Sequence, residues 1–164
     1  MITVRIESVN FDPKSQMGIV ILEVITLRDL EKKKIIPIWV GIFEAQAILF
    51  KLKNMYFPRP LTHDLMKNLL KELKGKVDFV LISDVSENTF YAEIHLNVDN
   101  EKITLDSRPS DAFALALRVD APIFVSEKVY QEHSWEREKF AEFQKSSAYQ
   151  KYLETSSDEE IGKA

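Results

Sequence analysis

Two stretches of the sequence follow the same plan, in which three strand-like segments lead into a helix-like segment. Apolar and polar residues alternate most clearly along residues 89–98, which is the pattern of a strand with one buried face. We expect strands over residues 2–9, 18–27, 34–40, 77–85, 89–98 and 102–106. The repeated order predicts an α+β fold with mixed or antiparallel sheets, built from a duplicated βββα unit.

The two helix-like segments support this duplication. IPIWVGIFEAQAILFKL lies without a gap over ITLDSRPSDAFALALRV, so that Glu44 falls opposite Asp111 and Lys51 opposite Arg118. Two buried helices can share a few positions by chance, and the duplication is therefore a hypothesis. If it is correct, Glu44 and Asp111 are equivalent carboxylates in the first turns of paired helices.

Two helices are expected between the strand groups. The first runs from Gly41 until Pro58 stops it, because no breaker lies between them. The second is PLTHDLMKNLLKELKG, with Thr62 as its N-cap and Gly75 at its end. Its predicted core face consists of Leu65, Leu69, Leu70 and Leu73.

Composition limits the class of protein. The 164 residues are 45% hydrophobic and 29% charged, with four glycines, which is the profile of one compact domain. The chain has no cysteine, and this excludes disulfides and thiol nucleophiles. No signal-peptide pattern is visible, and no stretch approaches the ~20 apolar residues of a membrane span. We expect a cytoplasmic protein that does not enter membranes.

The net charge of −4 argues against bulk attraction to nucleic acid, but the charges are unevenly distributed. Between Lys51 and Lys76 seven basic residues stand against two acidic ones, a local charge of +5. The basic residues are Lys51, Lys53, Arg59, Lys67, Lys71, Lys74 and Lys76. Such a run is either a solvated helix face or a surface that follows phosphates.

The segment TLDSRPSDAFALALR, residues 104–118, begins with charged residues and continues as an apolar helix. Ser107 is expected to cap this helix, and Pro109 suits its first turn. Asp111 lies near the positive end of the helix dipole, where an acid is favourable by up to ~1 kcal/mol. Helix formation alone therefore explains these three residues.

Two further charges at this entrance are not explained by helix formation. Arg108 is a cation at the positive end of the dipole, where it is disfavoured, and Asp106 ends a strand just before the turn. Together with Asp111 they predict a site. Arg118 lies about 10 Å further along the same stripe, and it either stabilises the C-terminal end of the helix or belongs to the site.

A second group of polar residues is RPLTHDL, residues 59–65. Asp64 is most simply an acid in the first turn of the second helix. His63, beside this acid and just after Arg59 and Pro60, suits a general base, a metal ligand or a phosphate contact, or else a plain surface histidine. We expect His63, Asp64, Asp106, Arg108 and Asp111 to converge on one cleft, with Glu44 nearby.

These motifs resemble a known family. RPLTHDL, SENTFYAEI and LDSRPSDAFALALRVDAPIFV, preceded by IPIWVGIFEAQAI, are similar to the bifunctional nuclease domain of bacteria and plants. The resemblance covers residues 1–130 and leaves residues 131–164 as a helical C-terminal extension with a frayed acidic tail. It implies an α+β fold, a symmetric oligomer and, from some members, an activity on both DNA and RNA.

The resemblance also implies a set of site residues. Phosphodiester hydrolysis needs an activated water and stabilised phosphate oxygens, commonly with Mg²⁺ or Mn²⁺ held by carboxylates, and we expect one of these metals here. The expected catalytic residues are His63, Asp64, Asp106 and Asp111. The expected substrate contacts are Arg59, Arg108, Ser110 and Arg118. The expected metal ligands are Glu44, Asp106 and Asp111.

The leading hypothesis is thus a nuclease acting on DNA and RNA, and one alternative stays open. In a non-catalytic binding or assembly module, the same acids and arginines would form a structural ion network. A homodimer is expected in either case, both from the resemblance and because several aromatic residues come too late in the chain to be needed by the core. These are Trp135, Phe140, Phe143 and Tyr149.

Overall fold

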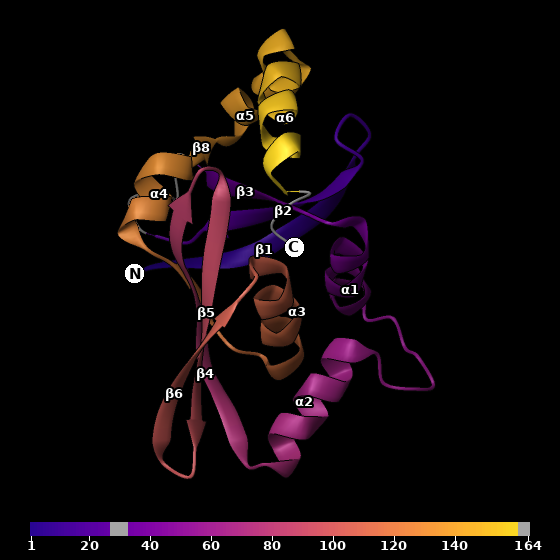
Figure 1. Ribbon diagram of the computed structural model, residues 1–164, viewed down its shortest axis with the longest axis vertical. Helices are drawn as coiled ribbons and strands as arrows, with labels where there is room; N and C mark the ends of the chain where they lie inside the picture. The colour runs from indigo at the N-terminus through magenta and orange to yellow at the C-terminus, as the bar shows by residue number, and fades with distance from the viewer. Residues whose placement is uncertain (27–32, 161–164) are drawn as a thin grey trace.

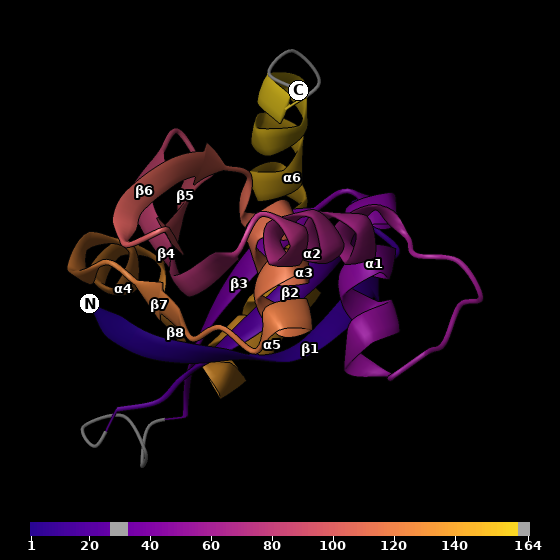
Figure 2. The same ribbon diagram turned by 90° about the horizontal axis from the view of Figure 1, so that it is seen from below.

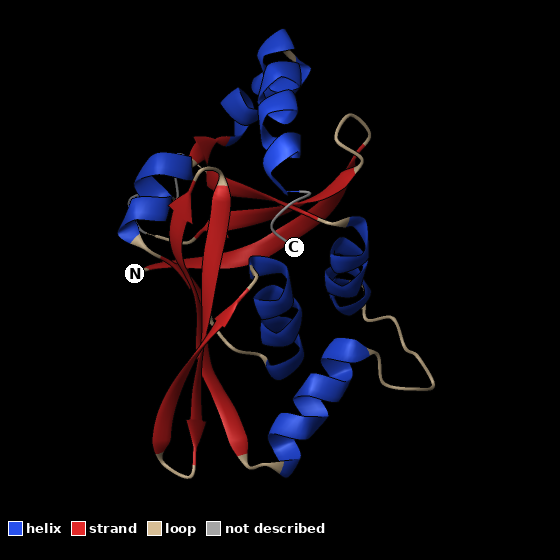
Figure 3. Cartoon of the chain, viewed as in Figure 1, coloured by secondary structure: helices blue, strands red, loops and turns tan. Residues whose placement is uncertain are grey.

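The computed structural model describes residues 1–26 and 33–160, with side chains through residue 155. Figures 1 and 3 show one strongly twisted sheet with helices against it. The strands are β1 (Ile2–Asp12), β2 (Met17–Val24), β3 (Lys34–Val40), β4 (Gly75–Ser86), β5 (Thr89–Val98), β6 (Glu101–Ser107), β7 (Ile123–Val125) and β8 (Trp135–Glu136). The helices are α1 (Ile42–Leu52), α2 (Thr62–Glu72), α3 (Pro109–Val119), α4 (Glu127–His133), α5 (Arg137–Lys145) and α6 (Ser147–Glu160).

The strand order in the sheet is β6-β5-β4-β7-β1-β2-β3-β8. Neighbouring strands are antiparallel except β4 and β7, which are parallel. The sheet is therefore mixed, and the predicted α+β class is confirmed. On either side of β7 the strands run outward in chain order, β4, β5, β6 on one side and β1, β2, β3 on the other. This arrangement agrees with a duplicated βββα unit whose helices are α1 and α3.

Helices α1, α2 and α3 form a layer on one face of the sheet (Figure 2). The central helix of this layer is α3, which contacts α1, α2, β4 and β5. Its residues from Ala112 to Ala116 are all buried, with Phe113 fully enclosed. Helix α1 comes very close to β2, because Gly18 leaves room for Ala45, and a Cβ at position 18 would overlap the Cβ of Ala45. This close packing fixes the start of α1, which carries Glu44.

The C-terminal helices α5 and α6 contribute to a second cluster on the opposite face of the sheet. Ile19 and Ile21 belong to this cluster and alternate along β2 with residues that face the main core. Phe140 is buried there, and Tyr149 donates to Asp12 and accepts from Trp39. The late aromatic residues thus pack within the chain, and they no longer argue for a dimer.

The start of the C-terminal segment is tied into the sheet. Strand β8 pairs with β3, with Ile35 opposite Trp135. Helix α4 precedes it and begins at Glu127, whereas the sequence predicted a helical extension only from residue 131. Residues 161–164 of the expected frayed tail lie outside the described residues. Leu27, the last residue of the second predicted strand, also lies outside them.

Several predicted helix ends were wrong. Helix α1 ends at Leu52, well before Pro58, because Asn54 turns the chain in the left-handed region at φ 51°. Helix α2 begins at Thr62 with Leu61 as its N-cap, and Thr62 does not cap it. At its other end Lys74, at φ 57°, makes the turn that was assigned to Gly75. These turns use non-glycine residues, so composition alone did not mark them.

The predicted core face of α2 was wrong for three of its four residues, and only Leu70 was correct. Leu65, Leu69 and Leu73 are exposed, at 51%, 53% and 67%. The residues of α2 that pack against the core are Met66 and Leu70. His63, one turn before Met66 on the same side of the helix, is also buried. The helix carries apolar residues on two adjacent stripes, and the sequence did not reveal which stripe faces inward.

Candidate active site

Arg108 connects the starts of α1 and α3. It is the N-cap residue of α3, its Nε donates to Asp111 Oδ2 at 2.8 Å, and one terminal nitrogen donates to Glu44 Oε1 at 3.0 Å. These two carboxylates offset the unfavourable position of a cation at a helix N-terminus. The hydrogen bond to Asp111 is the main reason that the pKa of Arg108 is raised. The two carboxylates that the alignment paired therefore meet at one guanidinium group.

His63 lies on the other side of Asp111. Its Nε2 is 3.0 Å from Asp111 Oδ1, and the residue is only 8% exposed. The hydrogen bond from His63, followed by that from Arg108, outweighs burial and lowers the pKa of Asp111 to about 2. Asp111 is therefore ionised at neutral pH, and Nε2 must donate. A neutral His63 ring then carries no proton on Nδ1, which can accept one.

A second ion pair lies beneath this group. Arg118 is 5% exposed, and its Nε donates to Asp64 Oδ1 at 2.7 Å. Its terminal nitrogens donate to the carbonyl oxygens of Ala114 and Ala47. Burial alone would raise the pKa of Asp64, but the hydrogen bonds from Arg118 and the Leu61 N–H lower it. This arginine joins α1, α2 and α3 from inside, a position that suits structure better than contact with a substrate.

The structure does not bring every expected residue to this place. Asp106 is exposed and lies opposite Glu93 in the β5–β6 ladder, whereas the neighbouring Ile94 is buried toward the helices. Residues directly opposite each other point to the same face of a sheet, so Asp106 lies on the face away from α3. The expected convergence of Asp106 with Asp111 is corrected. Ser107 does not cap α3, and its hydroxyl donates instead to the Arg108 carbonyl.

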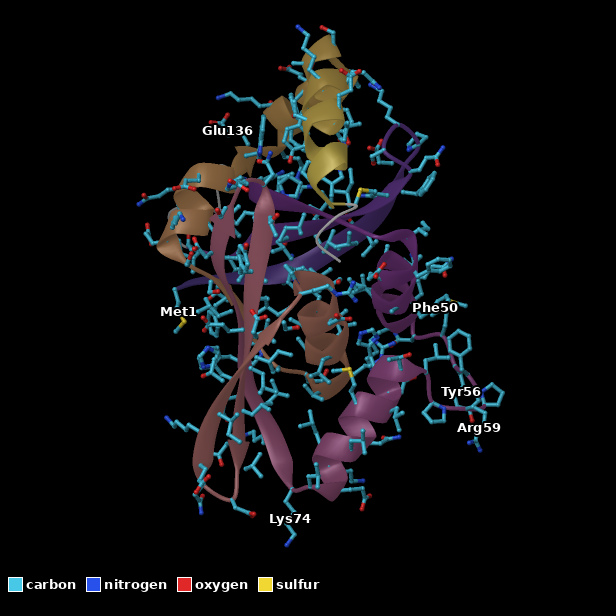
Figure 4. All side chains as sticks on the ribbon, in the orientation of Figure 1. Met1, Phe50, Tyr56, Arg59, Lys74 and Glu136 are labelled. Carbon is cyan, nitrogen blue, oxygen red and sulfur yellow. The ribbon has the colours of Figure 1, made fainter. Side chains whose placement is uncertain are left out.

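The two remaining expected substrate contacts differ in accessibility. Ser110 is 6% exposed, in the first turn of α3. Arg59 lies on the exposed loop between α1 and α2, and Figure 4 shows it beside Tyr56 at the outer end of that loop. Among the described residues, neither is joined by a hydrogen bond to the group formed by Arg108 with Glu44, Asp111 and His63.

The donor set around Arg108 does not fit a preformed metal site. Within residues 1–26 and 33–155, no three His, Asp or Glu side chains are arranged to hold a metal ion. The guanidinium group of Arg108 lies between Glu44 and Asp111, where a shared cation would bind. The third expected ligand, Asp106, lies on the other face of the sheet.

A basic groove lies at the far end of α2, where β4 begins and α3 ends. It has a volume of about 560 Å³, and its charged lining consists of Lys67, Lys71, Lys74, Lys76, Asp78 and Asp120. In the described part of the chain, none of these lysines lies in an ion pair. Figure 4 shows Lys74 at the tip of this end of the molecule. The basic run of the sequence is thus split, with four of its seven cations in one groove.

Sequence reasoning missed two features near these groups. The Ala47 and Ala114 carbonyls accept hydrogen bonds from Arg118, and backbone acceptors cannot be recognised from a pattern of side chains. The spacing of Lys67, Lys71 and Lys74, at i, i+4 and i+7, did place them on one side of a helix and could have indicated the groove.

Comparison with known proteins identifies the family of the chain. The bifunctional nuclease domain model matches residues 25–138, which include α1, α2, α3 and the ion network. The chain therefore belongs to the bifunctional nuclease domain family.

Named relatives come from bacteria and plants. An uncharacterized protein of Mycobacterium tuberculosis is 42% identical over 106 residues, which is 65% of this chain and 63% of that protein. Bifunctional nuclease 1 of Oryza sativa subsp. japonica is 30% identical over 98 residues, 58% of this chain and 30% of that protein. Bifunctional nuclease 2 of Arabidopsis thaliana is 25% identical over 95 residues, 56% and 29% respectively. The chain thus spans less than two thirds of these relatives.

Proposed function

We propose that this protein is a nuclease that hydrolyses phosphodiester bonds in DNA and RNA. Membership of the family and the plant relatives named bifunctional nucleases support the reaction class. The observation that carries the proposal is the chain of contacts from His63 through Asp111 to Arg108, which joins the proposed base to an exposed cation.

In this proposal His63 is the general base. Asp111 accepts from Nε2 and holds the ring in one orientation, so that Nδ1 is free to take a proton from water. A histidine oriented by a carboxylate is a common way to activate an oxygen nucleophile. Asp111 is then a positioning residue, since its own pKa of about 2 makes it a poor base at neutral pH.

Arg108 is the proposed phosphate contact. Its side chain is 60% exposed, and Glu44 and Asp111 take only two of its donor groups. The other N–H groups can bind phosphate oxygens in the planar geometry that guanidinium favours. Because the two carboxylates already fix the guanidinium, little side-chain entropy is lost when phosphate binds.

The basic groove is the proposed path for the rest of the nucleic acid. Its lysines start within one turn of His63 and continue to the other end of α2, an 11-residue helix and hence about 16 Å long. A strand crossing this surface would place several phosphates near lysine ammonium groups while one phosphate reaches Arg108.

Divalent-metal dependence, on Mg²⁺ or Mn²⁺, is a further proposal. Since the carboxylates are bridged by Arg108, we assign no preformed site to the ion. Mg²⁺ often binds through only one or two carboxylates together with substrate phosphates, which suits arrival with the substrate. Activity that survives a chelator would contradict this part of the proposal.

Two other properties remain proposals. A cytoplasmic location fits a chain without cysteine, and cell fractionation tests it. No helix among the described residues is long and apolar enough to cross a membrane. Self-association as a two-fold dimer is the second property, which sedimentation at micromolar concentration tests.

One observation favours the alternative of a non-catalytic assembly module. Glu44, Asp64 and Asp111 each bind an arginine, as a structural network requires. The 60% exposure of the Arg108 side chain supports the nuclease proposal instead, because its remaining N–H groups can be reached by a phosphate from solvent.

The direct test is a cleavage assay on single-stranded DNA, duplex DNA and RNA, with and without chelator. We expect cleavage of both DNA and RNA by the wild type and a loss of at least about 100-fold in Arg108→Gln. Equal cleavage by both proteins would indicate a contaminating nuclease and would refute the assignment of Arg108.

A binding measurement tests the groove separately. The groove variant changes Lys67, Lys71 and Lys74 to Gln, and its control changes Lys139, Lys145 and Lys151 to Gln. We expect only the groove variant to bind single-stranded DNA more weakly, as measured by fluorescence anisotropy.

A further inference from the structure

Strand β6 is an edge strand with an open side. It ends the sheet and pairs with β5 alone. In the described part of the chain, its backbone makes no further backbone hydrogen bonds outside the sheet. Residues 101–106 are exposed, and Figure 1 shows the course of β6 beside β5. An open edge presents unpaired N–H and C=O groups to another strand.

The side chains of β6 alternate between the two faces of the sheet. Ile103 and Leu105, 37% and 47% exposed, lie opposite Leu96 and Ile94 on the face that bears the helices. Lys102, Thr104 and Asp106 point to the other face. Apolar residues therefore continue the core to the edge of the sheet, while opposite charges stand on either side of Thr104.

This order is self-complementary. In an antiparallel pair of two β6 strands related by a two-fold axis at Thr104, Lys102 lies opposite the partner's Asp106, and the reverse pair forms at the other end. Ile103 then lies opposite the partner's Leu105. Opposite charges and apolar pairs directly across two strands each stabilise the pairing.

We propose that a second copy of this chain binds along β6, in antiparallel register about Thr104, and joins the two sheets into one. This inference rests on the proposed self-association and names its interface. The interface is isologous, because the same strand serves both copies.

Other symmetric registers are less favourable. A two-fold axis at Ile103 pairs Glu101 with the partner's Leu105. An axis at Leu105 brings Lys102 opposite the partner's Arg108, and an axis at Lys102 brings two lysines together. Like charges directly opposite destabilise a strand pair, so the register about Thr104 is selected by charge as well as by shape.

The interface also accounts for Asp106. This motif residue lies away from the candidate active site, and in the described part of the chain its carboxylate forms no ion pair. In the dimer it would bind the partner's Lys102. Lys102 would then have a specific role beyond that of a charge that keeps an open edge soluble.

Cysteine cross-linking tests the register, since the chain has no natural cysteine. In the proposed dimer Thr104→Cys lies opposite itself at about 5 Å between Cβ atoms, close enough for a disulfide after a small adjustment. Lys102→Cys, the matched control, lies about 14 Å along the strand from its own copy. We expect Thr104→Cys to form a covalent dimer under mild oxidation at least tenfold faster than Lys102→Cys.

Charge exchange tests the same contact without a cross-link. Lys102→Asp is expected to raise the dimer dissociation constant at least about tenfold, and Lys102→Asp combined with Asp106→Lys is expected to restore it. Lys145→Asp on α5 controls for net charge and should leave the constant unchanged. Thermal unfolding of each variant verifies that the monomer fold is kept.

The outcomes separate this interface from the proposal on which it rests. A monomer in sedimentation at every concentration would overturn both the dimer and its interface. A stable dimer with no preferred cross-link at Thr104 and no rescue by charge exchange would overturn the β6 interface alone. Neither result bears on the nuclease proposal, which is measured by cleavage.

Discussion

Asp111→Asn is the substitution with the clearest consequence for both stability and chemistry. Asp111 accepts hydrogen bonds from His63 and Arg108 through its two oxygens. An amide of the same shape can accept only one of them, and the carbonyl is expected to face the charged Arg108. The amide N–H then faces Nε2 of His63, which must accept. The His63 proton moves to Nδ1, and the proposed base is lost.

The stability change follows from the pKa of Asp111. Its fall from 3.8 to about 2 in the folded state corresponds to about 2 kcal/mol of stability. Because the folded pKa is the lower one, this stability is fully present above pH ~4 and is lost as pH falls toward ~2. The amide does not titrate, so the variant lacks this contribution. For a chain of this size, its melting midpoint should fall by about 4 to 8 °C at pH 7.

The assay measures unfolding and cleavage on the same preparation, well below the melting midpoint. We expect the variant to be folded and destabilised by about 2 kcal/mol, with cleavage slower by a factor of about 10² to 10⁴, the usual contribution of a general base. A cleavage rate within about threefold of the wild type, alongside the full loss of stability, would refute the catalytic reading and leave a structural network.

Other changes test separate parts of the structure. Arg118→Met should lower the free energy of unfolding by about 1 to 3 kcal/mol in chemical denaturation, because Asp64 and two backbone carbonyls lose a buried donor; a change below about 0.5 kcal/mol would show that these hydrogen bonds add nothing. Leu69→Gln should change stability by less than about 0.5 kcal/mol, whereas Leu115→Ala should cost about 2 to 5 kcal/mol, and similar losses would contradict the orientation of α2. The groove variant should reduce the slope of log K against log salt for single-stranded DNA by about 2, while an unchanged slope would remove the lysines from the binding surface.

The strand pattern predicted most of the fold. Two predicted strands, 34–40 and 89–98, have the same bounds in the structure. The second of these alternates apolar with polar residues, which is a local property that tertiary contacts seldom reverse. The first is a nearly continuous apolar run, as in a strand buried on both faces. Helix ends were harder to predict, because Asn54 and Lys74 adopt the left-handed conformation, which residues other than glycine seldom adopt. Which side of α2 is buried depends on its contacts with α3. These contacts are tertiary, and no local sequence pattern reveals them.

The site was predicted in part for similar reasons. The anomalous position of Arg108 at a helix N-terminus correctly indicated neighbouring carboxylates, and Glu44 and Asp111 supply them. The prediction for Asp106 was wrong because its closeness to Arg108 in the sequence does not show on which face of the strand its side chain lies. The buried role of Arg118 depends on the Ala47 carbonyl of another helix, which is a purely tertiary contact.

The most direct test of the central claim compares the two histidines that bind carboxylates on opposite faces of the sheet. His63 pairs with Asp111 beside Arg108, and His95 pairs with Glu93 on the face that carries Asp106. The measurement is the single-turnover cleavage rate of labelled RNA by His63→Gln and His95→Gln at equal folded concentration. We expect His63→Gln to be slower than wild type by at least about 100-fold and His95→Gln to differ by less than about threefold. Equal rates for the two variants would contradict the assignment of catalysis to the group around Arg108.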